Sequence, residues 1–366
     1  MAKQGWTLVE TLGPDGPSVI AREHEPRART SFDRTVTDLV GAGKAPGAEA
    51  ARRVRVLLAE LRERPGPRSA SISLRSGQHL TARMLPVIGP DATLHGVHLW
   101  LSPTPAPPSA TPLSAFGFGW DARQRIAEIP PALAAGTPRT RLTAPEVFRF
   151  LEPSPADALS LFETLLSQRP GAHWDGDVVV AAHGRQVPAR LVMTAGPTAE
   201  DAHRWRGMLF ETPGAEGIRT DSLEAAALAA IPRMTSVHLA VFDVAKMRML
   251  RWITDPMTDV QWKGQVDQRD TPHPDDVKRI FAAAEGIFTG RVEVSTVPGI
   301  RLRRKGGGWV VVDCTGSLMR TPPGSPQLLL VQFHVTGYSH EPDPVEPSDL
   351  GHPGLDDPRY PRYPLK

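Results

Sequence analysis

The amino-acid sequence predicts an α+β protein of three consecutive modules, each an antiparallel sheet with helices on one side. Three observations support this fold class. Breaks rich in Pro, Ser or Gly at Ser102–Pro112 and Pro213–Thr220 divide the chain into parts of similar size. In each part, segments of strand-like composition flank a segment with helical periodicity. Residues Pro153–Asp157 also align with Pro272–Asp276, which indicates duplicated domains.

The composition limits which classes of protein the sequence can encode. With 366 residues, 40% of them hydrophobic, the chain is long enough for two or three domains. Its net charge of +2 gives no general attraction to nucleic acid or to an anionic membrane. The single cysteine, Cys314, excludes an intrachain disulfide and a metal site built on several cysteines. No apolar run has the roughly 20 residues that cross a bilayer, and the first residues lack a signal peptide. We therefore expect a soluble, cytoplasmic protein.

The first module, residues 1–104, is expected to contain two strands, a helix and three strands. The helix carries Val54, Leu58 and Leu61 on one face and ends before Pro65. Apolar and β-branched residues mark the strands. These strands are Trp6–Leu12, Ser18–Arg22, Ala70–Leu74, Leu80–Pro86 and Leu94–Ser102.

The second module, residues 113–215, repeats this order. Ser154 is placed to cap a helix that starts at Pro155, and Asp157 completes a capping box. Leu159, Phe162 and Leu166 form the apolar face of this helix. The expected strands are Phe116–Asp121, Arg125–Ile129, Val178–Ala182, Val187–Thr194 and Trp205–Thr212.

The third module, residues 221–339, has the clearest pattern. One face of its amphipathic helix carries Val277, Ile280, Phe281, Ala284 and Phe288. Its helix begins at Pro274, because Pro, Asp275 and Asp276 suit a first helical turn, and Gly290 ends it. Gly306–Gly308 form a turn between two strands. The expected strands are Val237–Asp243, Arg248–Ile253, Val292–Arg304, Trp309–Cys314 and Gln327–Val335.

The last segment, His340–Lys366, is rich in Pro, Asp and Tyr and lacks apolar periodicity. Such a segment has too little apolar surface to offset the entropy of ordering. We expect it to be an extended tail that is dispensable for folding.

The third module resembles PAS domains in its motifs. His273-Pro274-Asp275-Asp276, the helix, Gly290, and then Arg301–Arg304 followed by Gly308-Trp309-Val310 look like one PAS subfamily pattern. The second module departs from it, because Ser154 replaces the histidine. The first module matches only in strand order, so both a divergent PAS and a GAF fold stay open.

The three-module plan, which opens with Trp6–Gly13 and ends with these motifs, resembles an actinobacterial family of sensor-only proteins. Members combine one GAF-like and two PAS-like domains without an effector domain. The resemblance implies a sensory function and supplies no catalytic residues.

Two single residues are candidates for binding a cofactor. His273 is a candidate haem ligand, but a lone histidine is weak support for a metal, and at this position it starts a helix. Cys314 is a candidate for a flavin adduct, but it lies on an expected strand, where a small buried cysteine packs as a hydrophobic residue. We expect no haem, flavin or transition metal.

No catalytic motif is found. Gly306–Gly308 beside Arg303, Arg304 and Lys305 could bind phosphate, but a phosphate loop needs a helix directly after the glycines, and a strand follows here. Asp275 and Asp276 are adjacent, so their side chains diverge and do not form an acid–base pair. We expect the protein not to be an enzyme.

Trp252, Trp262 and Trp309 are the candidate ligand-binding residues, because they gather in the third module. Aromatic rings line apolar pockets and also fill ordinary cores, so both interpretations stay open. The basic residues at the end of Val292–Arg304 could hold an anionic group. We therefore expect the third module to receive the signal.

The function that we infer is a non-enzymatic sensor or signalling scaffold that binds a small ligand or a protein partner. Two alternatives remain: an interaction adaptor that binds no ligand, and an enzyme with an unrecognised site between domains. The expected partners are a small molecule, another protein or a second copy of the chain, without nucleic acid and without membrane insertion.

Overall fold

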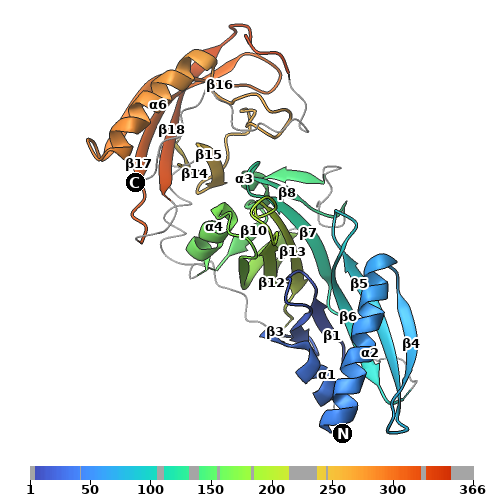
Figure 1. The fold of residues 1–366 in the computed structure, drawn as a ribbon. Coiled ribbons are helices and arrows are strands. Elements are labelled where there is room, and N and C mark those ends of the chain that lie inside the picture. Colours follow the sequence, from blue (N-terminus) through green and yellow to red (C-terminus); the bar gives the residue numbers. More distant parts are fainter. Residues whose placement is uncertain are drawn as a thin grey trace. The chain divides into compact units, whose positions relative to one another are not determined.

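The computed structural model describes residues 5–41, 43–104, 111–131, 140–154, 157–182, 185–213, 237–244, 246–322 and 327–347. These residues form three antiparallel sheets, which lie within residues 7–102, 115–211 and 237–339 (Figure 1). The α+β fold class is therefore confirmed. Most of the predicted break at Ser102–Pro112 and nearly all of the break at Pro213–Thr220 lie outside the described residues, so the exact module limits stay a prediction.

The three sheets share one strand order. In each, the first strand of the module pairs with the last strand, and the hairpin partners continue outward on both sides. The five main strands therefore run 2-1-5-4-3 in every module, whereas the sequence predicted only their succession along the chain. The third sheet shows it without additions, as β15-β14-β18-β17-β16.

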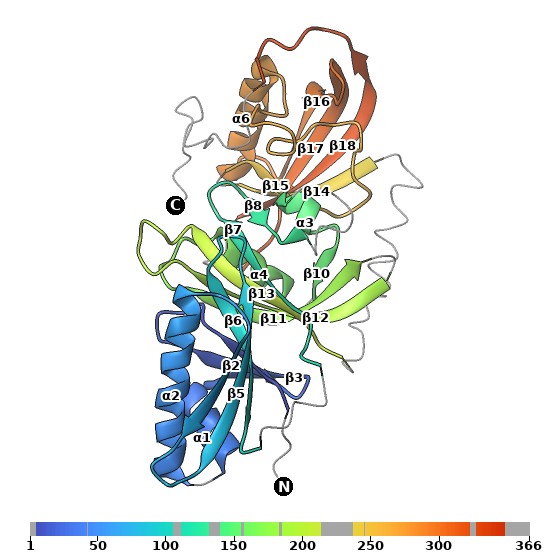
Figure 2. The same ribbon diagram turned by 90° about the vertical axis from the view of Figure 1, so that its right-hand side faces the viewer.

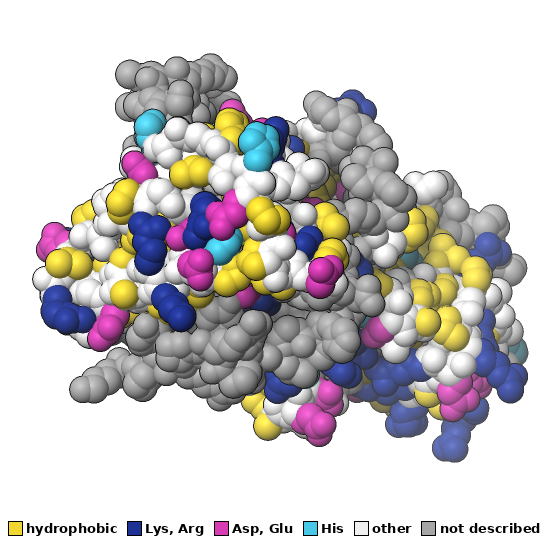
Figure 3. All heavy atoms as spheres, turned by 90° about the horizontal axis from the view of Figure 1, so that it is seen from above, with side chains coloured by type: hydrophobic (Ala, Val, Ile, Leu, Met, Phe, Trp, Pro, Cys, Tyr) yellow, Lys and Arg dark blue, Asp and Glu magenta, His cyan; other side chains and the backbone are white. Residues whose placement is uncertain are grey.

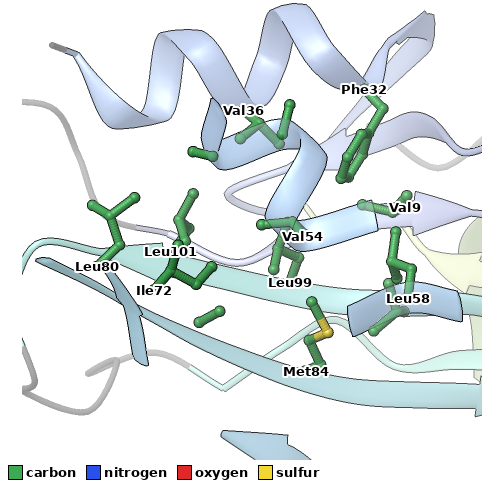
Figure 4. Packing of buried hydrophobic residues seen from close by; sticks show 14 of the residues in the cluster. Val9, Phe32, Val36, Val54, Leu58, Ile72, Leu80, Met84, Leu99 and Leu101 are labelled. Carbon is green, nitrogen blue, oxygen red and sulfur yellow. The ribbon is translucent and has the colours of Figure 1, made fainter. Parts of the chain in front are cut away.

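The first sheet has the order β3-β2-β1-β6-β5-β4 and is covered by two helices. Figure 4 shows side chains from both helices and from the sheet meeting in one apolar core, among them Phe32, Val54, Met84 and Leu99. The elements are β1 (Thr7–Glu10), β2 (Ser18–Arg22), β3 (Glu25–Ser31), α1 (Phe32–Val40), α2 (Lys44–Glu63), β4 (Arg68–Ser73), β5 (His79–Ile88) and β6 (Leu94–Ser102).

Sequence reasoning missed β3 and α1. Strand β3 is mostly exposed and lacks an apolar alternation that would reveal it. Helix α1 buries Phe32, Val36 and Val40, which are spaced four apart as on one face of a helix, so its periodic pattern could have been recognised. Its start also carries a capping signal, because the Ser31 side chain accepts a hydrogen bond from the Arg34 backbone N–H.

The second sheet has the order β10-β11-β12-β13-β7-β8-β9. Helix α4 begins at Ala158, later than predicted, because Ser154 caps a turn before the helix: its Oγ accepts from Asp157 N at 3.1 Å. The predicted start, Pro155, lies outside the described residues. The elements are β7 (Ala115–Asp121), β8 (Ile126–Glu128), β9 (Arg141–Thr143), α3 (Ala144–Val147), β10 (Leu151–Pro153), α4 (Ala158–Leu166), β11 (His173–Ala182), β12 (Arg185–Ala195) and β13 (Arg204–Glu211).

The first two sheets pack against each other and share a core. Strand β6 is buried along its whole length, which requires a second layer on the face turned away from the helices. Gly96 allows the close approach, since a Cβ there would lie 2.5 Å from the Met208 sulfur. The shared core contains Leu8, Leu12, Ile20, Ala21, Val87, Leu113, Val192, Met208 and Phe210.

The chain accordingly forms two compact units rather than three. One holds residues 1–122, 127–141 and 152–218, and the other holds residues 123–126, 142–151 and 219–366. The second unit therefore contains the whole third sheet together with two short segments that come earlier in the sequence.

The third sheet has helix α6 over one face (Figure 2). The helix starts at Pro274 as predicted, with the His273 side chain accepting from Asp275 N, and Gly290 follows its end with a φ of 69°. Gly306–Gly308 form the predicted turn, and all three have positive φ. The elements are β14 (Val237–Asp243), β15 (Arg248–Trp252), α6 (Pro274–Phe288), β16 (Val294–Arg303), β17 (Trp309–Leu318) and β18 (Leu328–Ser339).

The surface shows no dominant charge on the face drawn in Figure 3, where basic and acidic side chains are interspersed with hydrophobic ones. This mixture agrees with the net charge of +2. Among the described helices, none combines the length and the apolar composition needed to cross a membrane.

Candidate functional site

A cavity of about 630 Å³ lies between α6 and the third sheet. This volume falls within the roughly 300–1,000 Å³ typical of sites for small organic ligands. All residues that line it belong to the second compact unit, including residues 123–125 and 143–145. It is the strongest candidate for a binding site in the described part of the chain.

The wall of the cavity is mainly apolar. Helix α6 contributes residues three or four apart, which a helix places on one face, and the strands contribute alternate residues. The helix side consists of Val277, Ile280, Phe281, Ala284 and Ile287. The sheet side consists of Phe242, Met249, Val297, Leu302, Cys314, Gly316, Leu329, Val331 and Phe333.

Small residues facing one another create the space. Ala284 on the helix faces the sheet, where Gly316 and Cys314 lie two residues apart on β17. A Cβ atom at Gly316 would lie 3.6 Å from Leu329 and 3.7 Å from Ile287, both ordinary contact distances. The site therefore has room for added atoms without displacing backbone.

Cys314 is part of this wall, and its thiol is protonated at neutral pH. Burial in the apolar surroundings raises the pKa of its thiol to about 12. The thiolate is the reactive form of cysteine, so at neutral pH this side chain acts as a small hydrophobic residue.

Arg125 brings a buried positive charge to one end of the cavity. Its side chain is 4% exposed and donates from Nη2 to the carboxylate of Asp243, itself 3% exposed. Its Nε and Nη1 atoms have no hydrogen-bond partner among the described residues. The backbone is held in place, because the Arg125 carbonyl accepts from Ala144 N at 3.0 Å.

Further polar residues surround this end. The lining contains five basic residues and one acidic residue: Arg123, Arg125, Lys246, Arg248, Lys263 and Asp270. Lys263 and Asp270 form an ion pair with an Nζ–Oδ1 distance of 2.6 Å. The cavity lining thus combines many apolar side chains with several basic ones.

Only one of the three predicted tryptophans lines the cavity. Trp262 is in the wall, and Trp252 packs behind it in the core with a ring separation of 5.4 Å. Trp309 is fully buried elsewhere, against the His273 ring at 4.8 Å. The reason is strand alternation: Val310, the next residue on β17, faces the α6 side, so Trp309 points away. Trp252 and Trp309 therefore do not line this cavity, and ligand binding by the three tryptophans stays a prediction.

The motif at the start of α6 holds the helix to β16. The Asp276 carboxylate accepts from Arg301 N at 3.0 Å and from Arg301 Nε at 2.9 Å, and it also accepts from Arg279. Burial alone would raise the pKa of Asp276, but these hydrogen bonds outweigh it and keep that pKa below its usual range. No cluster of three His, Cys, Asp or Glu side chains in the described residues is placed to hold a metal ion.

The beginning of the predicted tail docks on the third sheet. Trp309 Nε1 donates to the Glu341 carbonyl at 2.9 Å, and Arg301 pairs with the Glu341 carboxylate at 2.6 Å. Asp343 pairs with Arg269 and with the buried Arg303. The prediction of an extended tail from His340 onward is therefore wrong for these residues, while residues 348–366 lie outside the described part.

In the predicted basic cluster at the end of β16, Arg303 is consequently covered by Asp343. Arg303 is 3% exposed, and burial together with the neighbouring Arg269 lowers its pKa to about 10, so it stays charged at neutral pH. The carboxylate of Asp343 occupies the place that we expected an anionic ligand to take. Arg304 lies over the Tyr338 ring, 5.0 Å from its centroid.

Three tandem antiparallel sheets with the opening strand of each module beside the closing strand define an α+β protein of PAS-like strand order. The chain belongs to the Rv3651-like family, whose N-terminal domain matches residues 5–110 and whose C-terminal domain matches residues 224–322. The family resemblance inferred from the motifs is thereby confirmed.

Solved structures agree with this assignment. The crystal structure of an uncharacterised protein from Mycobacterium tuberculosis is similar with a TM-score of 0.69 and 22% identity, covering 91% of this chain and 96% of that one. This similarity shows a shared fold. An RNA-binding light-oxygen-voltage receptor also aligns, but its TM-score of 0.24 at 13% identity, over 61% of this chain and 96% of that one, is too low to support an inference. No curated protein matches the sequence.

Sequence reasoning missed the residues that define the cavity. Arg125 was assigned to the start of a strand, and nothing local distinguishes it from the many other arginines of the chain. Gly316 lies within β17. A glycine inside a strand often marks a close approach or an open space, so this residue could have been recognised from the sequence.

Proposed function

We propose that the chain is a sensory protein without catalysis of its own, and that a small, largely apolar ligand binds in the cavity between α6 and the third sheet. The cavity itself carries the proposal. It is partly open to solvent, its lining is mainly apolar, and its volume of about 630 Å³ falls in the range of small-ligand sites. A small molecule with a large apolar part fits such a space.

Ligand binding would reach beyond the third sheet. Residues 123–125 and 143–145, which help to line the cavity, lie next to β8 and β9 in the sequence. A ligand that prefers one arrangement of these segments shifts the population toward it by the difference in its affinities. The signal would then be a change in how these segments pack, read by a partner protein.

A thermal-shift screen tests the proposal. A compound that binds only the folded state adds about 2.7 kcal/mol of stability at a hundred times its Kd, which raises the melting temperature measurably. The full-length chain is screened beside Gly316→Val, whose Cβ meets Leu329 and Ile287 at ordinary contact distances and whose two methyl groups take up space in the cavity. Gly337→Val is the matched control, because it makes the same change in β18 where the Cβ meets nothing within 4 Å.

We expect compounds that stabilise the unaltered chain and Gly337→Val but not Gly316→Val. A response that survives in Gly316→Val would place binding elsewhere. A broad screen with no stabilising compound would count against the sensor and favour an adaptor that binds only proteins.

A further inference from the structure

We infer that the ligand of this cavity is an amphiphile with an anionic oxygen group, which accepts hydrogen bonds from Arg125 while its apolar body lies between α6 and the sheet. The inference deepens the proposed function and rests on it. It names the chemical class of the ligand and the residue that recognises its charged end.

The state of Arg125 is the first support. A guanidinium carries five N–H donors, and a buried donor without an acceptor is costly enough that native structures rarely leave one. In Arg125 only Nη2 has a partner, Asp243, whereas Nε and Nη1 have none among the described residues although the side chain is 4% exposed. Arg125 lines the cavity, but Nε and Nη1 are covered in this structure, so binding as inferred requires the guanidinium to turn toward the ligand.

The charge of the lining is the second support. Five basic residues and one acidic residue line the cavity. Counted together with Asp243, which pairs with Arg125, these side chains carry five formal positive charges and two negative ones. Positive charge in the lining favours an anion over a neutral or cationic group.

The apolar wall is the third support and fixes the other half of the ligand. Between α6 and the strands, the lining is almost entirely hydrocarbon with the protonated thiol of Cys314. A small polar anion would leave this wall without contacts. A hydrocarbon chain or ring system attached to the anionic group satisfies both parts of the site.

The test compares ligands that share a hydrocarbon chain and differ in head group. Dodecanoate, dodecyl phosphate, dodecanol and dodecyltrimethylammonium are titrated calorimetrically into the full-length chain, below their micelle concentrations. Because hydrogen bonds to charged groups are the strong ones, we expect either anion to bind at least tenfold more tightly than dodecanol. A difference between the carboxylate and the phosphate then identifies which anion the site prefers.

A double variant tests the role of Arg125 itself. Arg125→Gln with Asp243→Asn removes both charges together, so that neither remains buried alone. The matched control is Arg55→Gln with Asp33→Asn, which removes an exposed pair between α1 and α2. We expect the first variant to bind dodecanol as before and to lose the preference for anions, and the control to keep that preference.

The outcomes separate the two proposals. Equal or tighter binding of dodecanol than of the anions to the unaltered chain overturns the inference and leaves the cavity as a ligand site. An anion preference that persists in the Arg125 variant also overturns it. If that variant does not fold, the comparison of head groups on the unaltered chain still decides. If none of the four binds while Gly316-dependent ligands emerge from the screen, only the inference falls; if nothing binds at all, both fall.

Discussion

Removing residues 340–347 should destabilise the third module, although the segment has little apolar surface of its own. A chain that ends at Ser339 loses the carboxylate of Asp343 and the carbonyl of Glu341. Arg303, 3% exposed, then keeps its charge without this partner, and the Trp309 Nε1 donor, on a fully buried side chain, loses its acceptor.

The size of the loss follows from these contacts. Removing one partner of a buried ion pair costs about 3–5 kcal/mol, and a lost hydrogen bond to a buried donor adds about 1 kcal/mol. The side chain of Asp343 is 24% exposed, and Arg303 still donates to the Asp270 carbonyl, so the lower end applies. We expect a loss of about 3 kcal/mol, which corresponds to roughly 6–12 °C in the melting temperature of a unit of this size.

Thermal and urea unfolding, followed by circular dichroism, measure this loss. The reference is a chain that ends at Pro347, because it retains every described contact of the segment. The first compact unit serves as an internal control, since its transition should not move. If the chains ending at Ser339 and at Pro347 unfold at the same temperature, the ion pairs of Asp343 contribute nothing and the docking has no energetic role.

Three further predictions concern single side chains. Burial lowers the pKa of His98 from 6.5 to about 4. Between these pH values the unfolded state binds a proton at His98 and the folded state does not. The free energy of unfolding should therefore fall by up to ~3 kcal/mol as pH drops from 6.5 toward 4. His98→Gln should flatten this pH dependence in urea unfolding. His273→Ala should cost about 1 kcal/mol through loss of the helix cap, and His273→Asn should restore most of it. Trp309→Phe should cost about 1 kcal/mol by losing the bond to Glu341, without changing ligand-induced stabilisation, because Trp309 lies outside the cavity.

Each of these has a distinct contrary result. An unchanged pH profile in His98→Gln would assign the acid sensitivity to other groups. Equal stability of the two His273 variants would show that capping is unimportant at α6. Loss of the ligand response in a folded Trp309→Phe protein would mean that the binding site includes the far face of the sheet.

Local interactions made most elements predictable. The start of α6 depends on His273, Pro274 and the two aspartates that follow, all within four residues, and the Gly306–Gly308 turn depends on positive φ. Where such signals were weak, as in the exposed β3, the sequence indicated no element. Helix α1 was missed although Ser31 caps it and its buried residues recur every four positions.

The candidate site was only partly predictable. Helical periodicity placed Val277, Ile280 and Ala284 on one face of α6, and that face lines the cavity. The tryptophans were grouped by closeness in sequence and by residue type, neither of which tells on which side of a strand a ring lies. A shift of one residue along a strand reverses the face, so Trp309 and Val310 have opposite surroundings.

Local patterns therefore specified the succession of most strands and helices along each module and the ends of α6, because periodicity, caps and turns depend on near neighbours. The family resemblance followed from short motifs such as His273–Asp276 and Gly308–Val310. The cavity, the buried pair of Arg125 and Asp243, and the docking of Asp343 on Arg303 depend on residues far apart in sequence: Arg125 and Asp243 are separated by 118 positions. Such a pairing leaves no periodic or capping pattern in the sequence. Its energy depends on bringing the two charges together in a buried place, which happens only when the chain folds.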